Sequence, residues 1–196
     1  AVRFRAESIW EMRPGVAWQG VGVDADGHRG PRVPRARSDA KRMACLGDGM
    51  TLGVHYDEPA CWPALLRARL DCEVLNFGVV GFTAVQGLAH YRDRVRPFKP
   101  DTLLVAFGGR HEAEPGASDL ERIARARTLS ERTRRFVARS GPLRWLFGLG
   151  APADLSPRVV RVSVVETERA LTELANEAKK DGVSVRFLSP PRPIAV

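Results

Sequence analysis

Met43-Ala-Cys-Leu-Gly-Asp-Gly-Met-Thr51 is the stretch that decides the fold, because a short apolar run leads directly into a glycine-rich loop. Residues 43–46 have the length and composition of a buried strand, and Gly47-Asp48-Gly49 then predicts a tight turn. Two more apolar runs, 74–77 and 102–107, also end in glycines. We therefore expect three buried strands, each followed by a loop of the same kind.

Helix signals lie between and after these strands. Residues 62–70 have apolar side chains at helical spacing, and Asp57 is the expected cap of that helix, with Pro59 in its first turn. Thr83 is expected to cap a second helix that Pro97 ends. The inward face of this second helix is expected to carry four apolar side chains, those of Val85, Leu88, Ala89 and Val95.

Two more helices and a fourth strand are expected downstream. Ser118 and Glu121 form a capping box for a long basic helix over 118–140. Residues 165–180 predict a further helix, and 183–188 a fourth strand. Alternation of this kind indicates an α/β fold with a mainly parallel sheet and helices on both faces. Parallel strands end at one edge of the sheet, so three loops are expected to meet there: residues 47–51, 78–83 and 108–112.

Residues 1–40 differ from the rest in composition, being rich in proline, glycine and turn residues. We expect an amino-terminal arm with turns, attached to the main body by Trp10 and Trp18. The main domain is expected to occupy 41–196.

Composition excludes several classes of protein. The chain has 196 residues and 44% hydrophobic residues, which is typical of a globular domain, and no apolar run is long enough to span a bilayer. The three cysteines have neither disulfide-framework nor zinc-ligand spacing, and Cys45 is expected in the core. His28, His55 and His90 lack metal-like spacing and are expected at the surface or in turns, so no metal or other cofactor is predicted.

The three glycine loops resemble the blocks of the SGNH (GDSL-type) hydrolases. Residues 45–53 resemble the first block, in which Gly-Asp-Ser carries the nucleophile. Residues 75–83 resemble the second block, whose glycine, here Gly81, lends its N–H to the oxyanion hole, and residues 100–109 resemble the strand into the third. The resemblance implies a bacterial ester (acyl) hydrolase with a three-layer flavodoxin-like fold of about four strands. It also implies an exported or membrane-anchored protein whose signal has been removed.

The catalytic positions of that family depart from its pattern. Gly49 stands where the serine nucleophile is expected, Arg110 replaces the oxyanion asparagine, and His111 replaces the aspartate after it. The Asp-x-x-His block that supplies the base is absent, as is the last strand-helix unit. Acyl transfer needs a nucleophile, a base and a group that orients the base, so we expect an inactive hydrolase. His111 is a weak candidate base in the third loop.

An anion pocket is what we expect to survive. The segment after Gly49 is expected to begin a short helix, whose N–H groups would face the same space as the N–H of Gly81. Arg110 would add a cation suited to carboxylate or phosphate. Asp48 is expected to accept backbone N–H groups in its own loop, and Thr51 to hydrogen-bond at the helix start. The predicted ligand is therefore a small anion or an acyl or acidic group.

Two other interpretations stay open at this point. One is an incomplete chain of an active esterase. The other is a basic module, because the net charge is +8 and arginines stud 122–144 ahead of Trp145 and Phe147. Segment 122–147 would then face an anionic membrane, whereas nucleic acid is not favoured because no nucleic-acid-binding motif occurs. The fourth strand is expected at a sheet edge, which either residues 190–196 or another copy of the chain would cover.

Overall fold

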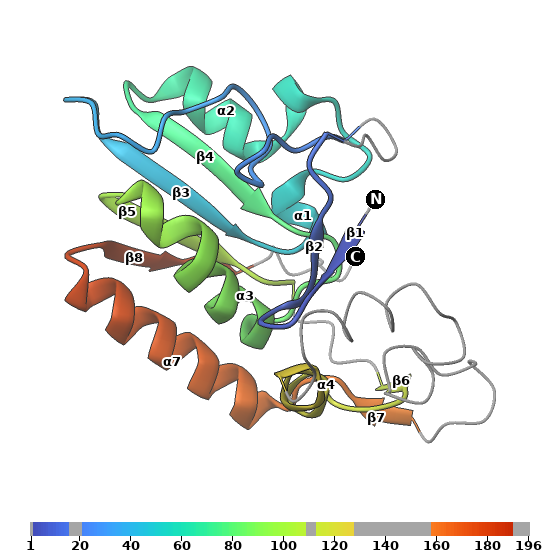
Figure 1. The fold of residues 1–196 in the computed structure, drawn as a ribbon. Coiled ribbons are helices and arrows are strands. Elements are labelled where there is room, and N and C mark those ends of the chain that lie inside the picture. The colour runs from blue at the N-terminus through green and yellow to red at the C-terminus, as the bar shows by residue number, and fades with distance from the viewer. Residues whose placement is uncertain (1, 16–20, 109–112, 128–157, 190–196) are drawn as a thin grey trace, which may run out of the picture.

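Figure 1 shows a twisted central sheet with helices packed on it and a small hairpin across one end. This computed structural model describes residues 2–15, 21–108, 113–127 and 158–189. The central sheet has four strands in the order β4-β3-β5-β8, and every neighbouring pair is parallel. The strands are β3 (Arg42–Gly47), β4 (Glu73–Gly78), β5 (Thr102–Ala106) and β8 (Ser184–Phe187). The predicted α/β fold with a parallel sheet of about four strands is confirmed.

One face of the sheet is covered by α3 (Ala84–His90) and α7 (Val164–Lys180). The helix α3 runs on through a wider turn, η2 (Tyr91–Val95), into a 3-10 turn, η3 (Arg96–Phe98). Its predicted inward face is buried, and Thr83 caps it in a capping box with Gln86. The largest apolar cluster of the described residues lies between these helices and the sheet. Burial of this face is the main stabilising contribution we assign to the fold.

The opposite face carries α1 (Gly49–Leu52), the 3-10 turn η1 (Glu58–Ala60) and α2 (Trp62–Arg69). Asn76 of β4 faces this side, where its Nδ2 donates to the carbonyl of Leu52. One expectation for this region was wrong: Asp57 stands at the start of η1 but makes no side-chain cap. The helix expected over 62–70 is present as α2, which buries Pro63 and Ala64 and leaves Leu65 and Leu70 exposed.

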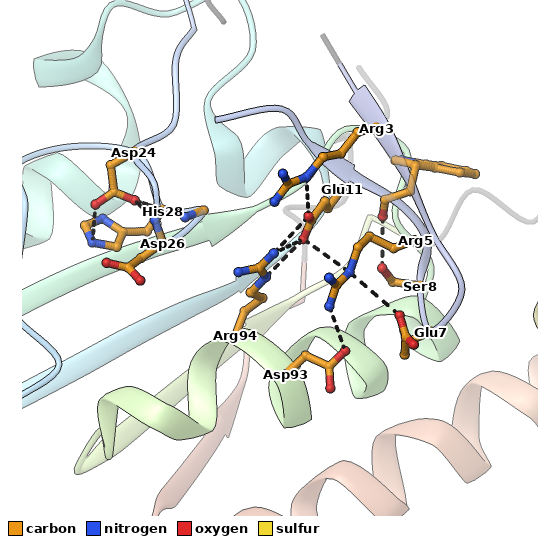
Figure 2. Close-up of polar contacts among 12 residues, drawn as sticks. Arg3, Arg5, Glu7, Ser8, Glu11, Asp24, Asp26, His28, Asp93 and Arg94 are labelled. Atoms are coloured by element: carbon orange, nitrogen blue, oxygen red, sulfur yellow. Dashed lines mark hydrogen bonds and ion pairs between the residues drawn. The ribbon is translucent and has the colours of Figure 1, made fainter. Parts of the chain in front are cut away.

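The amino-terminal region contains an antiparallel hairpin, β1 (Val2–Arg5) and β2 (Ile9–Met12), where the sequence predicted only an arm with turns. Figure 2 shows how charged groups attach this hairpin to η2, the turn that follows α3. Glu11 is buried and accepts hydrogen bonds from Arg94 and Arg3, and Arg5 pairs with Asp93. Trp18 lies outside the described residues.

A second small sheet joins β6 (Ala113–Pro115) to β7 (Arg158–Val160), next to α4 (Asp119–Arg127). The predicted capping box of Ser118 and Glu121 is present at the start of α4. The rest of the expected basic helix, 128–140, and the segment 143–147 lie outside the described residues, as do 190–196 beyond the edge strand β8. Among the helices that the structure describes, none has the length and apolar character needed to cross a membrane.

Two histidines are not where the sequence suggested. His90 is buried within α3, and His28, although in a turn, is also buried, with its ring against Phe77 and Phe98. Only His55 is an exposed turn residue as expected. Aromatic partners explain both burials, since a neutral imidazole can pack as an aromatic ring. Cys45 lies in the core, as predicted.

Candidate functional site

The loops after β3, β4 and β5 meet at the carboxyl edge of the sheet. Asp48 joins the first loop to the third, because one carboxylate oxygen accepts the Met50 N–H at 2.9 Å and the other accepts the Gly108 N–H at 2.6 Å. Thr51 is fully buried, and its hydroxyl donates to the carbonyl of Ala106 at the end of β5 rather than bonding at the helix start as expected. Both side chains therefore tie loops together, and the Thr51 hydroxyl is occupied.

Close packing requires glycine at the ends of β3 and β4. A Cβ atom at Gly47 would lie under 3.0 Å from the carbonyl oxygen of Ala106 and from the Thr51 side chain. A Cβ at Gly78 would come equally close to the backbone of Leu52. Neither glycine has a positive φ, so steric contact rather than backbone conformation is the reason. Because neither position has a Cβ atom, Thr51 and Leu52 of α1 can pack directly against the ends of β3 and β4.

Gly49, expected from the sequence to stand at the nucleophile position, has space that the other two glycines lack. A Cβ atom there would meet the Val54 Cγ2 atom at 3.5 Å and the Val80 Cα atom at 3.9 Å, which are ordinary van der Waals distances. Its φ is not positive, and it is the first residue of α1. The fold would accept a side chain at Gly49, so nothing in the packing accounts for the missing hydroxyl.

Two backbone donors remain unused beside this space. Within the part of the chain that the structure describes, the N–H groups of Gly49 and Gly81 have no hydrogen-bond acceptor. The next N–H along α1, that of Met50, is already taken by Asp48. Gly49 and Gly81 belong to neighbouring loops, as the approach of Gly49 to Val80 shows. At the start of α1, the Met50 N–H is thus occupied, whereas the Gly49 N–H is left without an acceptor among the described residues.

The loop around Gly81 is held by residues that the sequence did not single out for this task. The Trp10 indole Nε1–H donates to the carbonyl of Val80 at 3.0 Å, and Arg161 donates through Nη1 to the carbonyl of Gly81 at 2.8 Å. Trp10 was expected only to anchor the arm. No local signal marks Arg161, because its partners come from segments far away in the chain.

Arg161 belongs to a buried polar network behind the same loop. Its guanidinium donates to both carboxylate oxygens of Asp119 and, through Nη2, to the Gln86 side-chain oxygen at 2.7 Å. Asp119 is fully buried and also accepts the Thr83 hydroxyl at 2.7 Å. Thr83 and Gln86 begin α3, so the network connects α3, α4 and the segment after β7. A buried charge needs such partners, because an unpaired one is expensive.

His90 lies beneath this loop, with its ring 5.3 Å from that of Phe82. Burial lowers the pKa of His90 to about 4, so the ring is neutral near pH 7. Its Nε2 atom is buried and has no hydrogen-bond partner. His90 lies behind Phe82 rather than in the open space at Gly49, so it is not placed to act as a base there.

The remaining predicted site residues, Arg110 and His111, lie outside the described residues. No group of three or more His, Cys, Asp or Glu side chains that could hold a metal ion occurs within the described ranges. The site that can be described therefore consists of Asp48, the backbone at Gly49 and Gly81, and the side chains that hold them.

Comparisons with known proteins give partial matches. No family model matches the chain. Over 72 residues it is 33% identical to thioesterase 1/protease 1/lysophospholipase L1 of Escherichia coli (strain K12), a match that covers 36% of this chain and 35% of that enzyme. The matched region is thus about a third of the length of this curated relative.

Solved structures with a similar fold are more distant in sequence. A GDSL-like lipase from Bacteroides thetaiotaomicron is 15% identical, with a TM-score of 0.44, and covers 79% of this chain and 51% of its own. A catalytic mutant of Axe2, an acetylxylan esterase from Geobacillus stearothermophilus, is 19% identical, with a TM-score of 0.43, and covers 80% and 62%. A thioesterase/lysophospholipase, a GDSL-like lipase and an acetylxylan esterase are thus among the proteins to which the chain is similar.

Proposed function

We propose that this chain is an SGNH hydrolase-like domain that does not hydrolyse esters and instead binds a small anion, or the acidic or acyl group of a ligand, at its oxyanion position. The observation that carries the proposal is Gly49. It stands at the nucleophile position with space around it, and its N–H and that of Gly81 have no acceptor among the described residues.

The absence of hydrolysis follows from the chemistry of acyl transfer. A hydroxyl or thiol must attack the carbonyl carbon, and a base within hydrogen-bond reach must take its proton. Gly49 has no side chain, and the nearby Thr51 hydroxyl donates to a main-chain carbonyl. Removing a nucleophile from such a site lowers kcat by about a million-fold. What is left, pre-placed N–H donors, binds negative charge without supplying a reaction.

Anion binding fits the charge of the molecule. The net charge of +8 draws anions towards the surface in general, and unused N–H groups then provide a specific place. Arg110 belongs to the third loop in the sequence, and a guanidinium there would pair with a carboxylate or phosphate in a two-pronged hydrogen bond. We propose that Gly49, Gly81 and Arg110 bind the ligand together.

Calorimetric titration with acetate, phosphate, sulfate and a fatty acid tests the binding. Gly49→Pro removes only the N–H, because Gly49 is the first residue of α1, where proline is well tolerated, and Asp48 before it is extended. Gly49→Ala keeps the N–H and serves as the matched control. We expect Gly49→Pro and Arg110→Ala to weaken binding by about tenfold or more and Gly49→Ala to leave it nearly unchanged.

Two results would contradict this proposal. One is the absence of binding of any of the four ligands to the unaltered chain, and the other is binding that neither Gly49→Pro nor Arg110→Ala changes. Esterase activity is tested separately, with short-chain nitrophenyl esters on the chain and on Gly49→Ser. We expect no activity in either. Hydrolysis by the unaltered chain, or labelling of a defined side chain by a fluorophosphonate, would show that a nucleophile exists.

A further inference from the structure

The Gly81 N–H has its direction set from the other side of its own peptide group. That peptide joins Val80 to Gly81, and no peptide bond of the described chain is cis. In a trans peptide the C=O and the N–H point in opposite directions. Because the Trp10 indole donates to the Val80 carbonyl at 3.0 Å, the Gly81 N–H must point away from the indole.

The next peptide is held as well. Arg161 donates to the Gly81 carbonyl at 2.8 Å, so both peptide groups that flank Gly81 are fixed by side chains. Gly81 has a φ of 69°, in the left-handed region that glycine enters freely. A glycine with that freedom and no such contacts would let its N–H turn. The two side chains therefore hold a direction that the backbone alone would not keep.

Trp10 and Arg161 also hold one another. The Arg161 guanidinium carbon lies 4.9 Å from the centre of the Trp10 ring, within the range of a cation–π interaction. Arg161 is fixed in turn by Asp119 and Gln86, and Trp10 packs edge-on against Phe82. Loss of either side chain would loosen the other, so the pair acts as a single clamp on the loop.

The hairpin accepts backbone strain next to Trp10. Ile9 has a φ of 66°, which is unfavourable for a β-branched residue, and its side chain is buried in the core. Ser8 and the ion pairs of Glu11 fix the chain on either side of the strained residue, as Figure 2 shows. Strain of this kind persists only where surrounding contacts enforce it, and it often occurs near functional positions.

From these contacts we infer that Trp10 and Arg161 are positioning residues that aim the Gly81 N–H into the ligand position. The inference rests on the proposed function, because it gives that N–H its use. A donor fixed in advance needs no reorganisation when the anion arrives. The hydrogen bond from Trp10 to the Val80 carbonyl also polarises the same peptide, which makes its N–H a stronger donor.

Nuclear magnetic resonance tests the inference in the free protein, where no ligand is needed. The variant is Trp10→Phe, which keeps an aromatic ring over the loop but has no N–H to donate. We expect the ¹⁵N–¹H residual dipolar coupling and the order parameter of Gly81 to change, and those of Gly49 to stay as they are. Arg161→Lys keeps a positive charge but loses the planar guanidinium with its several N–H donors. We expect it to change the coupling and the order parameter of Gly81 as well.

Titration with acetate and phosphate then measures the consequence for binding. Trp10→Phe should weaken binding about three- to tenfold, the size expected from the loss of one well-aligned donor. Val95→Ala is the control for a merely structural effect, because it removes buried volume from the core far from the loop and should leave affinity and the Gly81 signals unchanged.

The two failures can be told apart. If the unaltered chain binds no anion, the proposed function fails, while the Gly81 couplings still decide whether Trp10 and Arg161 set the N–H direction. If Gly81 keeps its coupling and order parameter in both Trp10→Phe and Arg161→Lys, the positioning role is wrong, whatever the affinity. Changes that Val95→Ala reproduces would overturn it equally.

Discussion

Two loops at the same edge of the sheet differ in how tightly they are packed and in what holds them. The first loop, 47–51, is tightly packed at Gly47 but open at Gly49, where the fold would accept a side chain that the sequence lacks. The second loop, 78–83, is held by Trp10 from the hairpin and by Arg161 from the segment after β7. Gly49, the proposed nucleophile position, lacks a side chain for no steric reason, whereas side chains from two other segments hold Gly81, the proposed donor position. Contacts that fix the second loop in this way are expected if the Gly81 N–H binds a ligand, as we propose.

The contacts that hold the second loop also require two charged side chains to be buried, which is unfavourable in free energy. Asp119 is completely buried and Arg161 nearly so, and taking two charges out of water is unfavourable unless both are fully hydrogen-bonded. Here the carboxylate accepts from the guanidinium and from the Thr83 hydroxyl, which meets that requirement. The first loop contains no comparable buried pair among its described contacts. The following predictions test whether this difference is real.

The largest effect is expected from a single methyl group in the first loop. Gly47→Ala places a Cβ against the Ala106 carbonyl and should cost about 4–5 kcal/mol or more, whereas Gly49→Ala should stay within about 0.5 kcal/mol. Urea denaturation of both variants measures the difference. Equal stability of the two would mean that packing at the two glycines is alike, and the contrast within the loop would disappear.

Breaking the charged pair behind the second loop is expected to come next. Arg161→Met leaves the Asp119 carboxylate buried without its main partner and should lower the free energy of unfolding by about 3–5 kcal/mol. Adding Asp119→Asn removes the stranded charge and should recover part of that loss. The double-mutant cycle measures the coupling, and strictly additive losses would show that the two side chains do not interact.

His90, beneath the second loop, predicts a pH dependence. Burial lowers its pKa in the folded state to about 4, below the unfolded value of 6.5, so the unfolded chain binds the extra proton first. Stability should therefore be complete above about pH 6.5 and fall as the pH drops towards 4, by on the order of 3 kcal/mol. Denaturation of the chain and of His90→Leu at several pH values measures this.

The His90→Leu variant should lose much less stability over the same interval. Glu11, which is also buried, titrates in a lower pH range than the one in which His90 acts. Burial raises the pKa of Glu11, but hydrogen bonds from Arg94 and Arg3 outweigh this effect and lower the pKa overall. The contribution of Glu11 to stability is complete above its unfolded pKa of about 4.5. It is lost as the pH falls from there through the lower pKa of the folded state. Parallel curves for the two proteins between pH 6.5 and 4.5 would contradict the role of His90.

The smallest effect concerns the link between the first and third loops. Asp48→Asn keeps one acceptor oxygen but turns an N–H₂ group towards either the Met50 or the Gly108 N–H, so one hydrogen bond is lost. We expect a loss of about 1–3 kcal/mol, since the acceptor is charged. Thermal unfolding measures it. A variant as stable as the unaltered chain would mean that the first loop does not depend on Asp48.

Much of the fold could be predicted because its signals are local. The strands β3 and β5 contain continuous apolar runs, and Thr83 and Ser118 carry capping boxes whose two partners lie within three residues of each other. The hairpin could not be predicted in this way, since each of its strands has only four residues and one begins at a strained Ile9. Short strands leave too few positions for alternation to show.

In the candidate site, too, residues with a local sequence signal could be predicted, and residues whose partners are distant in the chain could not. Gly49 and Gly81 could be found because motif spacing and the rule for parallel sheets place their loops together. Trp10 and Arg161 could not be assigned their roles, because Trp10 lies 70 residues from Val80 and Arg161 lies 80 residues from Gly81. His28 and His90 were misjudged since a histidine gives no sign of burial without its aromatic neighbours.

The amino-acid order by itself determined the succession of strands and helices, the glycines at the strand ends, and the lack of a hydroxyl at residue 49, since each of these depends on neighbours along the chain. Only the tertiary structure decided which way the Gly81 N–H is held and which charges are buried behind it. Those properties depend on contacts between segments that folding brings together, and a hydrogen bond is sensitive to tenths of an ångström that no sequence pattern records.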